Sequence, residues 1–79
     1  MQETSRAQEA TDAGAQVASE LGRRIRTLRV THGLTQEELA LLSGVSVRFV
    51  GDLERGKPTV RLSGVLAVCH VLGLAVLPS

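Results

Sequence analysis

The sequence predicts an all-α domain of four to five helices that ends in a short β-strand. Apolar residues recur at helical spacing along most of the chain. Capping residues or glycines flank each of these stretches, so several short helices are expected rather than one long one. The apolar run LAVL, residues 74–77, follows the last helix-ending glycine and favours a strand.

The chain has 79 residues, a single cysteine and a net charge of +1. A domain of this size buries only about 60% of its unfolded surface, so oligomerisation would usefully supplement its core. One cysteine permits neither an intrachain disulfide nor a metal cluster, which fits a reducing cytoplasm. No apolar run approaches the ~20 residues that cross a membrane. Without a phosphate-binding glycine loop or a nucleophile–base pair, we expect neither an enzyme nor a bound cofactor.

Charge divides the chain into two regions. Residues 1–15 carry a net charge of −2, have almost no apolar periodicity and are predicted to form a disordered tail. Residues 16–79 carry a net charge of +3 and are predicted to form the folded domain.

The first predicted helix spans about residues 17–32 and ends before Gly33. One face of it carries four apolar residues at spacings of four and three: Val17, Leu21, Ile25 and Leu28. Three arginines occupy its other faces, at positions 23, 24 and 26. They either form a solvated surface or contact phosphates.

Two short helices follow, at about residues 36–42 and 47–55. Thr35 and Glu38 have the form of a capping box, and Ser46 is placed to cap the second helix. Gly44 permits the sharp turn between them. The expected inward residues are Leu39, Ala40, Leu42, Val50 and Leu53. Two helices joined in this way form a helix-turn-helix, whose second helix enters the major groove of DNA while the first lies across the backbone.

The fourth predicted helix spans about residues 60–72. Its expected core residues are Leu62, Val65, Leu66, Cys69 and Leu72. Its opposite face is apolar too, and a helix that is apolar nearly all round needs more than one covering neighbour. We therefore expect a homodimer in which the C-terminal strands pair, with an interface of Val68, Val71, Leu74, Val76 and Leu77. A twofold dimer suits a palindromic operator.

Three stretches together resemble a known family: LGRRIRTLR, GLTQEELALLSGVSVRFVGDLERGK and the following apolar pattern as far as LGL. They are similar to the lambda-repressor-like helix-turn-helix domain of phage-repressor (Xre) type, and within it to HipB-like antitoxins. The resemblance implies a cytoplasmic, sequence-specific repressor of double-stranded DNA that also controls its own toxin–antitoxin operon. It further implies a HipA-like kinase toxin as a partner. A stand-alone phage-type repressor and a protein-only interaction module are the alternatives.

The resemblance also implies roles for individual residues. The positions expected to face bases are Ser46, Val47, Arg48 and Asp52. The expected phosphate contacts are Thr35, Gln36, Arg55, Lys57 and Arg61. Arg29 and Glu54 match an internal ion pair. Asp52 has two readings, since it could accept a hydrogen bond from a cytosine amino group or orient Arg48 one turn away. Gly51 departs from the family pattern, where a larger polar residue is usual.

Overall fold

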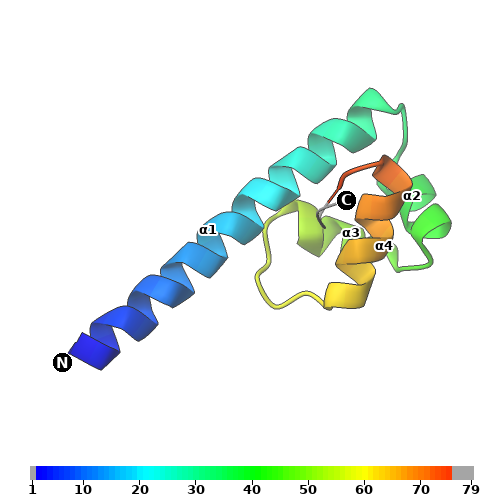
Figure 1. Cartoon of the computed structure of the whole chain (residues 1–79). Helices are drawn as coiled ribbons and strands as arrows, with labels where there is room; N and C mark the ends of the chain where they lie inside the picture. The colour runs from blue at the N-terminus through cyan, green and yellow to red at the C-terminus, as the bar shows by residue number, and fades with distance from the viewer. Residues whose placement is uncertain (1, 76–79) are drawn as a thin grey trace.

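Helix α1, Gln2–Thr31, is by far the longest helix in residues 2–75, the part of the chain that the computed structural model describes. It is followed by α2 (Gln36–Ser43), α3 (Val47–Glu54) and α4 (Leu62–Leu72). The three shorter helices gather beside the C-terminal half of α1, and its N-terminal half projects away from them (Figure 1). None of these helices is long and apolar enough to cross a membrane within the described range.

The N-terminal half of α1 differs from the predicted disordered tail at residues 1–15, because the chain is helical from Gln2 onward. The side chains of residues 5–17 are all exposed, including that of Val17, which was expected to pack. Ala, Gln, Glu and Arg favour helix, and Gln8 Nε2 donates a 3.0 Å hydrogen bond to Asp12 Oδ1 one turn on. The absence of an apolar stripe in this segment correctly indicates that it makes no packing contacts, but it does not prevent helix formation. A helix that is already packed at one end can extend into such a segment, because extension costs much less than nucleation.

The ends of α2 and α3 confirm the predicted caps. Thr35 Oγ1 accepts a 3.0 Å hydrogen bond from the Glu38 amide, and the Thr35 amide donates to Glu38 Oε1 over 2.9 Å. The bond from the Thr35 amide to the carboxylate is the main cause that lowers the pKa of Glu38, and the Thr35 side chain adds to it. Ser46 Oγ accepts from the Phe49 amide over 3.0 Å. Gly44 ends α2 in the left-handed conformation with φ 68°, so the turn between the two helices requires glycine.

All four helices contribute to one core. Its fully buried side chains are Ile25, Leu39, Val50, Val68 and Cys69. Two glycines allow close contacts around this core. A Cβ at Gly22 would overlap the main-chain oxygen of Leu53, so α1 crosses the end of α3 closely. A Cβ at Gly64 would overlap the Phe49 ring, which therefore lies directly against α4.

Several residues expected in the core or at the dimer interface lie elsewhere. In α4 the buried residues Val65, Val68, Cys69 and Leu72 follow the i, i+3, i+4, i+7 spacing of one helix face. Val68 therefore belongs to the core and cannot reach a partner chain. The expected core residues Leu42, Leu62 and Leu66 are exposed. The inward face of α2 consists of Leu39 and Ala40 instead, and that of α4 of the four buried residues just named.

The predicted C-terminal strand is wrong for the described residues. Gly73 ends α4 in the left-handed conformation with φ 71°. The Leu74 amide then donates a 2.8 Å hydrogen bond to the Cys69 carbonyl, and the Leu74 side chain packs against the core. Leu74 thus completes the helix cap, and residues 2–75 contain no strand. Val76 and Leu77, also assigned to the strand and the dimer interface, lie outside the described residues.

Candidate nucleic-acid interface

The first turn of α3 presents the expected base-facing side chains. Val47 is 43% exposed, and the Arg48 side chain is exposed beside it. Arg48 takes part in none of the ion pairs among the described residues, so its guanidinium can bond an external partner. Ser46 is also exposed, but its hydroxyl accepts the capping bond from Phe49 and retains only donor capacity and one lone pair. An arginine can bond guanine at two atoms, and a valine can pack on a thymine methyl.

Asp52 does not accompany these residues. Its carboxylate turns toward the C-terminal end of α3, where Oδ1 lies 2.5 Å from Arg55 Nη2 and Oδ2 lies 3.6 Å from Lys57 Nζ. The Asp52 side chain is 18% exposed, whereas those of Arg55 and Lys57 are 70% and 50% exposed. Base reading by Asp52 would require it to leave both partners. Sequence reasoning missed this cluster, although the i, i+3 spacing of Asp52 and Arg55 is typical of a helical ion pair.

The other expected phosphate contacts divide between the start of α2 and the start of α4. The Thr35 hydroxyl serves the capping box, and Gln36 Nε2 donates a 3.1 Å hydrogen bond to Glu54 Oε1. Gln36 therefore offers its main-chain amide, which at the first position of a helix has no partner within the helix. Arg61 precedes α4, where its guanidinium lies 5.6 Å from the centre of the Phe49 ring and Nε donates to Ser63 Oγ.

Arg29 and Glu54 form the ion pair that the resemblance implied. Arg29 Nε lies 2.6 Å from Glu54 Oε2, and Nη2 lies 3.1 Å from Oε1. The Arg29 and Glu54 side chains are only 13% and 4% exposed. Arg29 Nη1 also donates to the Leu34 carbonyl over 2.8 Å. With the bond from Gln36, this network joins α1, the loop after it, α2 and α3, and so fixes the angle at which α3 is presented.

The network also sets the protonation of its members. Burial acts to raise the pKa of Glu54, but hydrogen bonds from Arg29 and Gln36 and the charges of Arg29 and Arg26 outweigh it, so the pKa is lowered. The hydrogen bond with Glu54 is the main cause that raises the pKa of Arg29. Both groups are therefore ionised at neutral pH.

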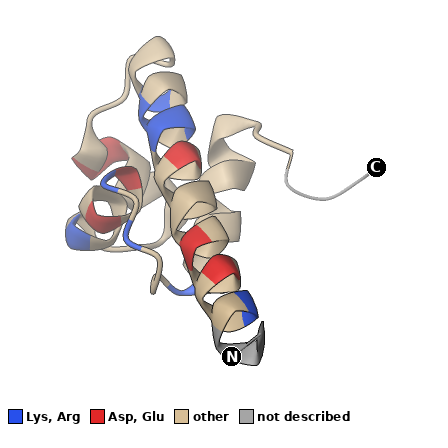
Figure 2. Ribbon diagram, turned by 90° about the vertical axis from the view of Figure 1, so that its left-hand side faces the viewer, with Lys and Arg blue, Asp and Glu red and all other residues tan. Residues whose placement is uncertain are grey.

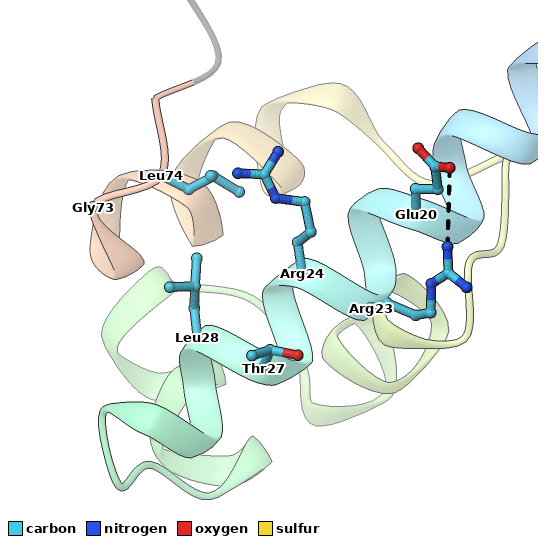
Figure 3. A pocket seen from close by; sticks show the side chains of 7 residues that line it. All are labelled: Glu20, Arg23, Arg24, Thr27, Leu28, Gly73 and Leu74. Atoms are coloured by element: carbon cyan, nitrogen blue, oxygen red, sulfur yellow. Dashed lines mark ion pairs between the residues drawn. The ribbon is translucent and has the colours of Figure 1, made fainter.

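Four of the five arginines of α1 lie in its C-terminal half, at positions 23, 24, 26 and 29, whereas Glu3, Glu9 and Asp12 outnumber Arg6 in its projecting half (Figure 2). Arg23 is 4.0 Å from Glu20, and both side chains are mostly exposed. With Arg24, they line a cleft of about 460 Å³ between α1 and the chain that follows α4 (Figure 3). The remaining lining residues are Thr27, Leu28, Gly73 and Leu74. None of the residues that line this cleft belongs to α3.

Comparisons with known proteins agree with this geometry. A family model described as a helix-turn-helix domain matches residues 20–77, which include α2, α3 and α4. Over 58 residues, the chain is 41% identical to a protein of Sinorhizobium fredii named as an uncharacterized HTH-type transcriptional regulator, y4mF. That match covers 73% of this chain and 76% of the relative. A second uncharacterized HTH-type transcriptional regulator, YazB of Bacillus subtilis, is 51% identical over 35 residues, 44% of this chain and 51% of that protein.

Proposed function

Because this chain belongs to the helix-turn-helix domain family and is a DNA-binding transcriptional regulator of phage-repressor type, we propose that it is a homodimeric repressor of a palindromic operator. The observation that supports this proposal best is the first turn of α3. Val47 and the unpaired Arg48 are exposed there, on a helix held by the partly buried network of Arg29, Gln36 and Glu54. A rigid helix that presents a free guanidinium is suited to read bases in the major groove.

The phosphate contacts in this proposal flank the recognition helix. The Gln36 amide is at the start of α2, where the helix dipole favours an anion, and Arg61 is at the start of α4. Backbone contacts on both sides of α3 would fix its register on the duplex while Arg48 and Val47 supply the sequence preference.

The dimer in this proposal does not use a C-terminal strand. Of the described residues expected at the interface, Val71 and Leu74 are partly exposed and remain available. A dimer with twofold symmetry would place two α3 helices about one helical turn of DNA apart, which is what a palindromic site requires.

We further propose that the operon is of HipBA-like toxin–antitoxin type and that the protein also binds a HipA-like kinase toxin in the cytoplasm. The resemblance in sequence pattern supports this proposal, and exposed Leu41 and Leu42 at the end of α2 offer apolar surface for a protein partner. A stand-alone phage-type repressor is the alternative. Co-expression with the product of the neighbouring gene separates the two, because only an antitoxin should rescue growth from that product and co-purify with it.

Selection from a library of random duplexes tests the DNA proposal. The full chain should enrich a palindrome whose half-sites are centred about 10 base pairs apart. Its affinity for that site should fall steeply with salt. A protein that enriches no sequence and binds no duplex at low salt would instead be a protein-only interaction module.

A further inference from the structure

Arg55 lies along the surface of α3 instead of extending away from it, and Gly51 makes this possible. A Cβ at position 51 would be 3.1 Å from Arg55 Nη1 and 3.8 Å from the central guanidinium carbon. Gly51 is buried although it lies on an outward part of the helix, since the Arg55 guanidinium covers it. The Arg55 guanidinium thus occupies space that a side chain larger than alanine at position 51 would fill.

The same carboxylate holds Lys57 on its other oxygen. The Lys57 amide also donates a 3.0 Å hydrogen bond to the Asp52 carbonyl, so the start of the loop after α3 is tied to the helix by its main chain. The ammonium group is 3.6 Å from Oδ2, and Arg55 is 2.5 Å from Oδ1. The Asp52 carboxylate therefore contacts both cations with its two oxygens.

The arrangement gives this cluster of Asp52, Arg55 and Lys57 a net charge of +1 in place of +2. A phosphate that approaches Arg55 or Lys57 must displace the carboxylate or share the cations with it. This competition acts equally on every duplex, because the phosphate backbone has the same charge whatever the sequence. Arg48 is outside the cluster, so the contacts that distinguish sequences are not reduced.

We propose that Asp52 is a specificity-determining residue that acts as an internal substitute for phosphate: it neutralises Arg55 and Lys57 and so suppresses binding to non-cognate DNA. The proposal rests on the proposed function, since it concerns the affinity of the same helix for duplexes. Gly51 contributes by leaving room for the Arg55 guanidinium against the helix.

Titrations with Asp52→Asn test the proposal on two probes: a mixed-sequence 24-base-pair duplex and the site selected with the unmodified protein. Two exposed ion pairs are disrupted, so we expect affinity for the mixed duplex to rise roughly three- to tenfold at 100 mM salt. The slope of log affinity against log salt should steepen by up to about 0.9, the value for one more phosphate neutralised. Affinity for the selected site should rise less, so the ratio of the affinity for the selected site to that for the mixed duplex should fall.

Glu37→Gln is the matched control, because it removes one negative charge from the adjacent helix α2 at a residue outside the ion pairs of the described residues. Arg55→Gln, made alone and with Asp52→Asn, provides the second test. Loss of Arg55 should weaken binding to the mixed duplex more when Asp52 is already replaced, since only then is the guanidinium free.

The proposal would be overturned if Asp52→Asn left the affinity for the mixed duplex unchanged, or if Glu37→Gln raised that affinity equally. It would also be overturned if the effects of Asp52→Asn and Arg55→Gln were additive, or if Asp52→Asn lost affinity for the selected site alone. The last would mean that Asp52 reads a base. A weaker Asp52→Asn protein with a lower melting temperature would assign Asp52 a structural role only. If the unmodified protein bound no duplex, the proposed function would fail first, and the two failures are thereby distinguished.

Discussion

Arg48 is the side chain with which the proposed function is most directly tested. It is exposed at the first turn of α3 and takes part in no ion pair among the described residues. Arg48→Ala should cost about 1–3 kcal/mol on the selected operator and flatten the preference at one base position. Arg61→Ala, which removes an expected phosphate contact, should weaken binding to operator and mixed duplex alike. An equal loss on both duplexes for Arg48→Ala would remove its base-reading role.

Two helical glycines should respond in opposite directions to the same substitution. A Cβ at Gly51 meets only the movable end of Arg55, so Gly51→Ala should raise the stability by up to about 1 kcal/mol through helix propensity. A Cβ at Gly22 meets the main chain of Leu53 and Glu54, which cannot move aside, so Gly22→Ala should cost about 1–3 kcal/mol or more. Thermal unfolding of the two variants side by side measures both. A stabilised Gly22→Ala would contradict the close crossing of α1 and α3.

At the scale of elements, the ion pair between Arg29 and Glu54, whose side chains are 13% and 4% exposed, joins α1 to α3. Glu54→Gln leaves the Arg29 charge buried without its carboxylate, and we expect a loss of about 3–5 kcal/mol in the free energy of unfolding. Glu37→Gln, on the exposed face of α2, should change it by no more than about 0.5 kcal/mol. Denaturant titrations of both variants give the comparison. Similar, small changes in the free energy of unfolding of the two variants would mean that the ion pair contributes little to stability.

The same carboxylate gives a pH dependence whose sign follows from its lowered pKa. In the unfolded chain Glu54 should titrate near its ordinary value of 4.5, and in the folded chain it titrates lower. Its contribution to stability is therefore complete above pH 4.5 and disappears as the pH falls through the folded value. The stability gap between the unmodified protein and Glu54→Gln should narrow on acidification across this range. A gap that stays constant or widens below pH 4.5 would contradict the lowered pKa.

Removal of the projecting half of α1 should have little effect on the stability of the packed four-helix domain. The side chains of residues 5–12 are exposed, so deletion of residues 2–12 should change the melting temperature only slightly, while helical ellipticity per molecule falls. Binding of the selected operator should be retained. Loss of several degrees, or of operator binding, would show that this segment supports the body or contacts DNA.

At the scale of the whole molecule, the sequence predicted best those features that depend on near neighbours. The capping box of Thr35 and Glu38 and the left-handed turn at Gly44 need only a few residues, and both are present. Errors arose where a helix could turn more than one face inward. Val68 was placed outside and Leu62 inside, because α4 is apolar all round and its rotation depends on how it packs against α1, α2 and Phe49.

The strand at the C-terminus was mispredicted for a related reason. The run LAVL has strand composition, but Leu74 completes the cap of α4 and packs on the core, which removes it from any strand. In the candidate interface, the motif predicted where Arg48 and Asp52 lie along α3. It did not predict the direction of the Asp52 carboxylate, because that depends on the space left by Gly51 and on the fold of the loop that carries Lys57.

Cys69 offers a way to observe the whole molecule open. It is the chain's only cysteine and is fully buried in the core, where desolvation raises the pKa of the thiol and keeps it unreactive. A thiol reagent can therefore modify Cys69 only in molecules whose core has opened, so the rate of modification reports the population of the opened state. Because any ligand that binds the folded state alone makes such openings rarer, an operator duplex should slow the modification in proportion to its saturation. Cys69 is thus a built-in chemical probe of unfolding that requires no introduced cysteine.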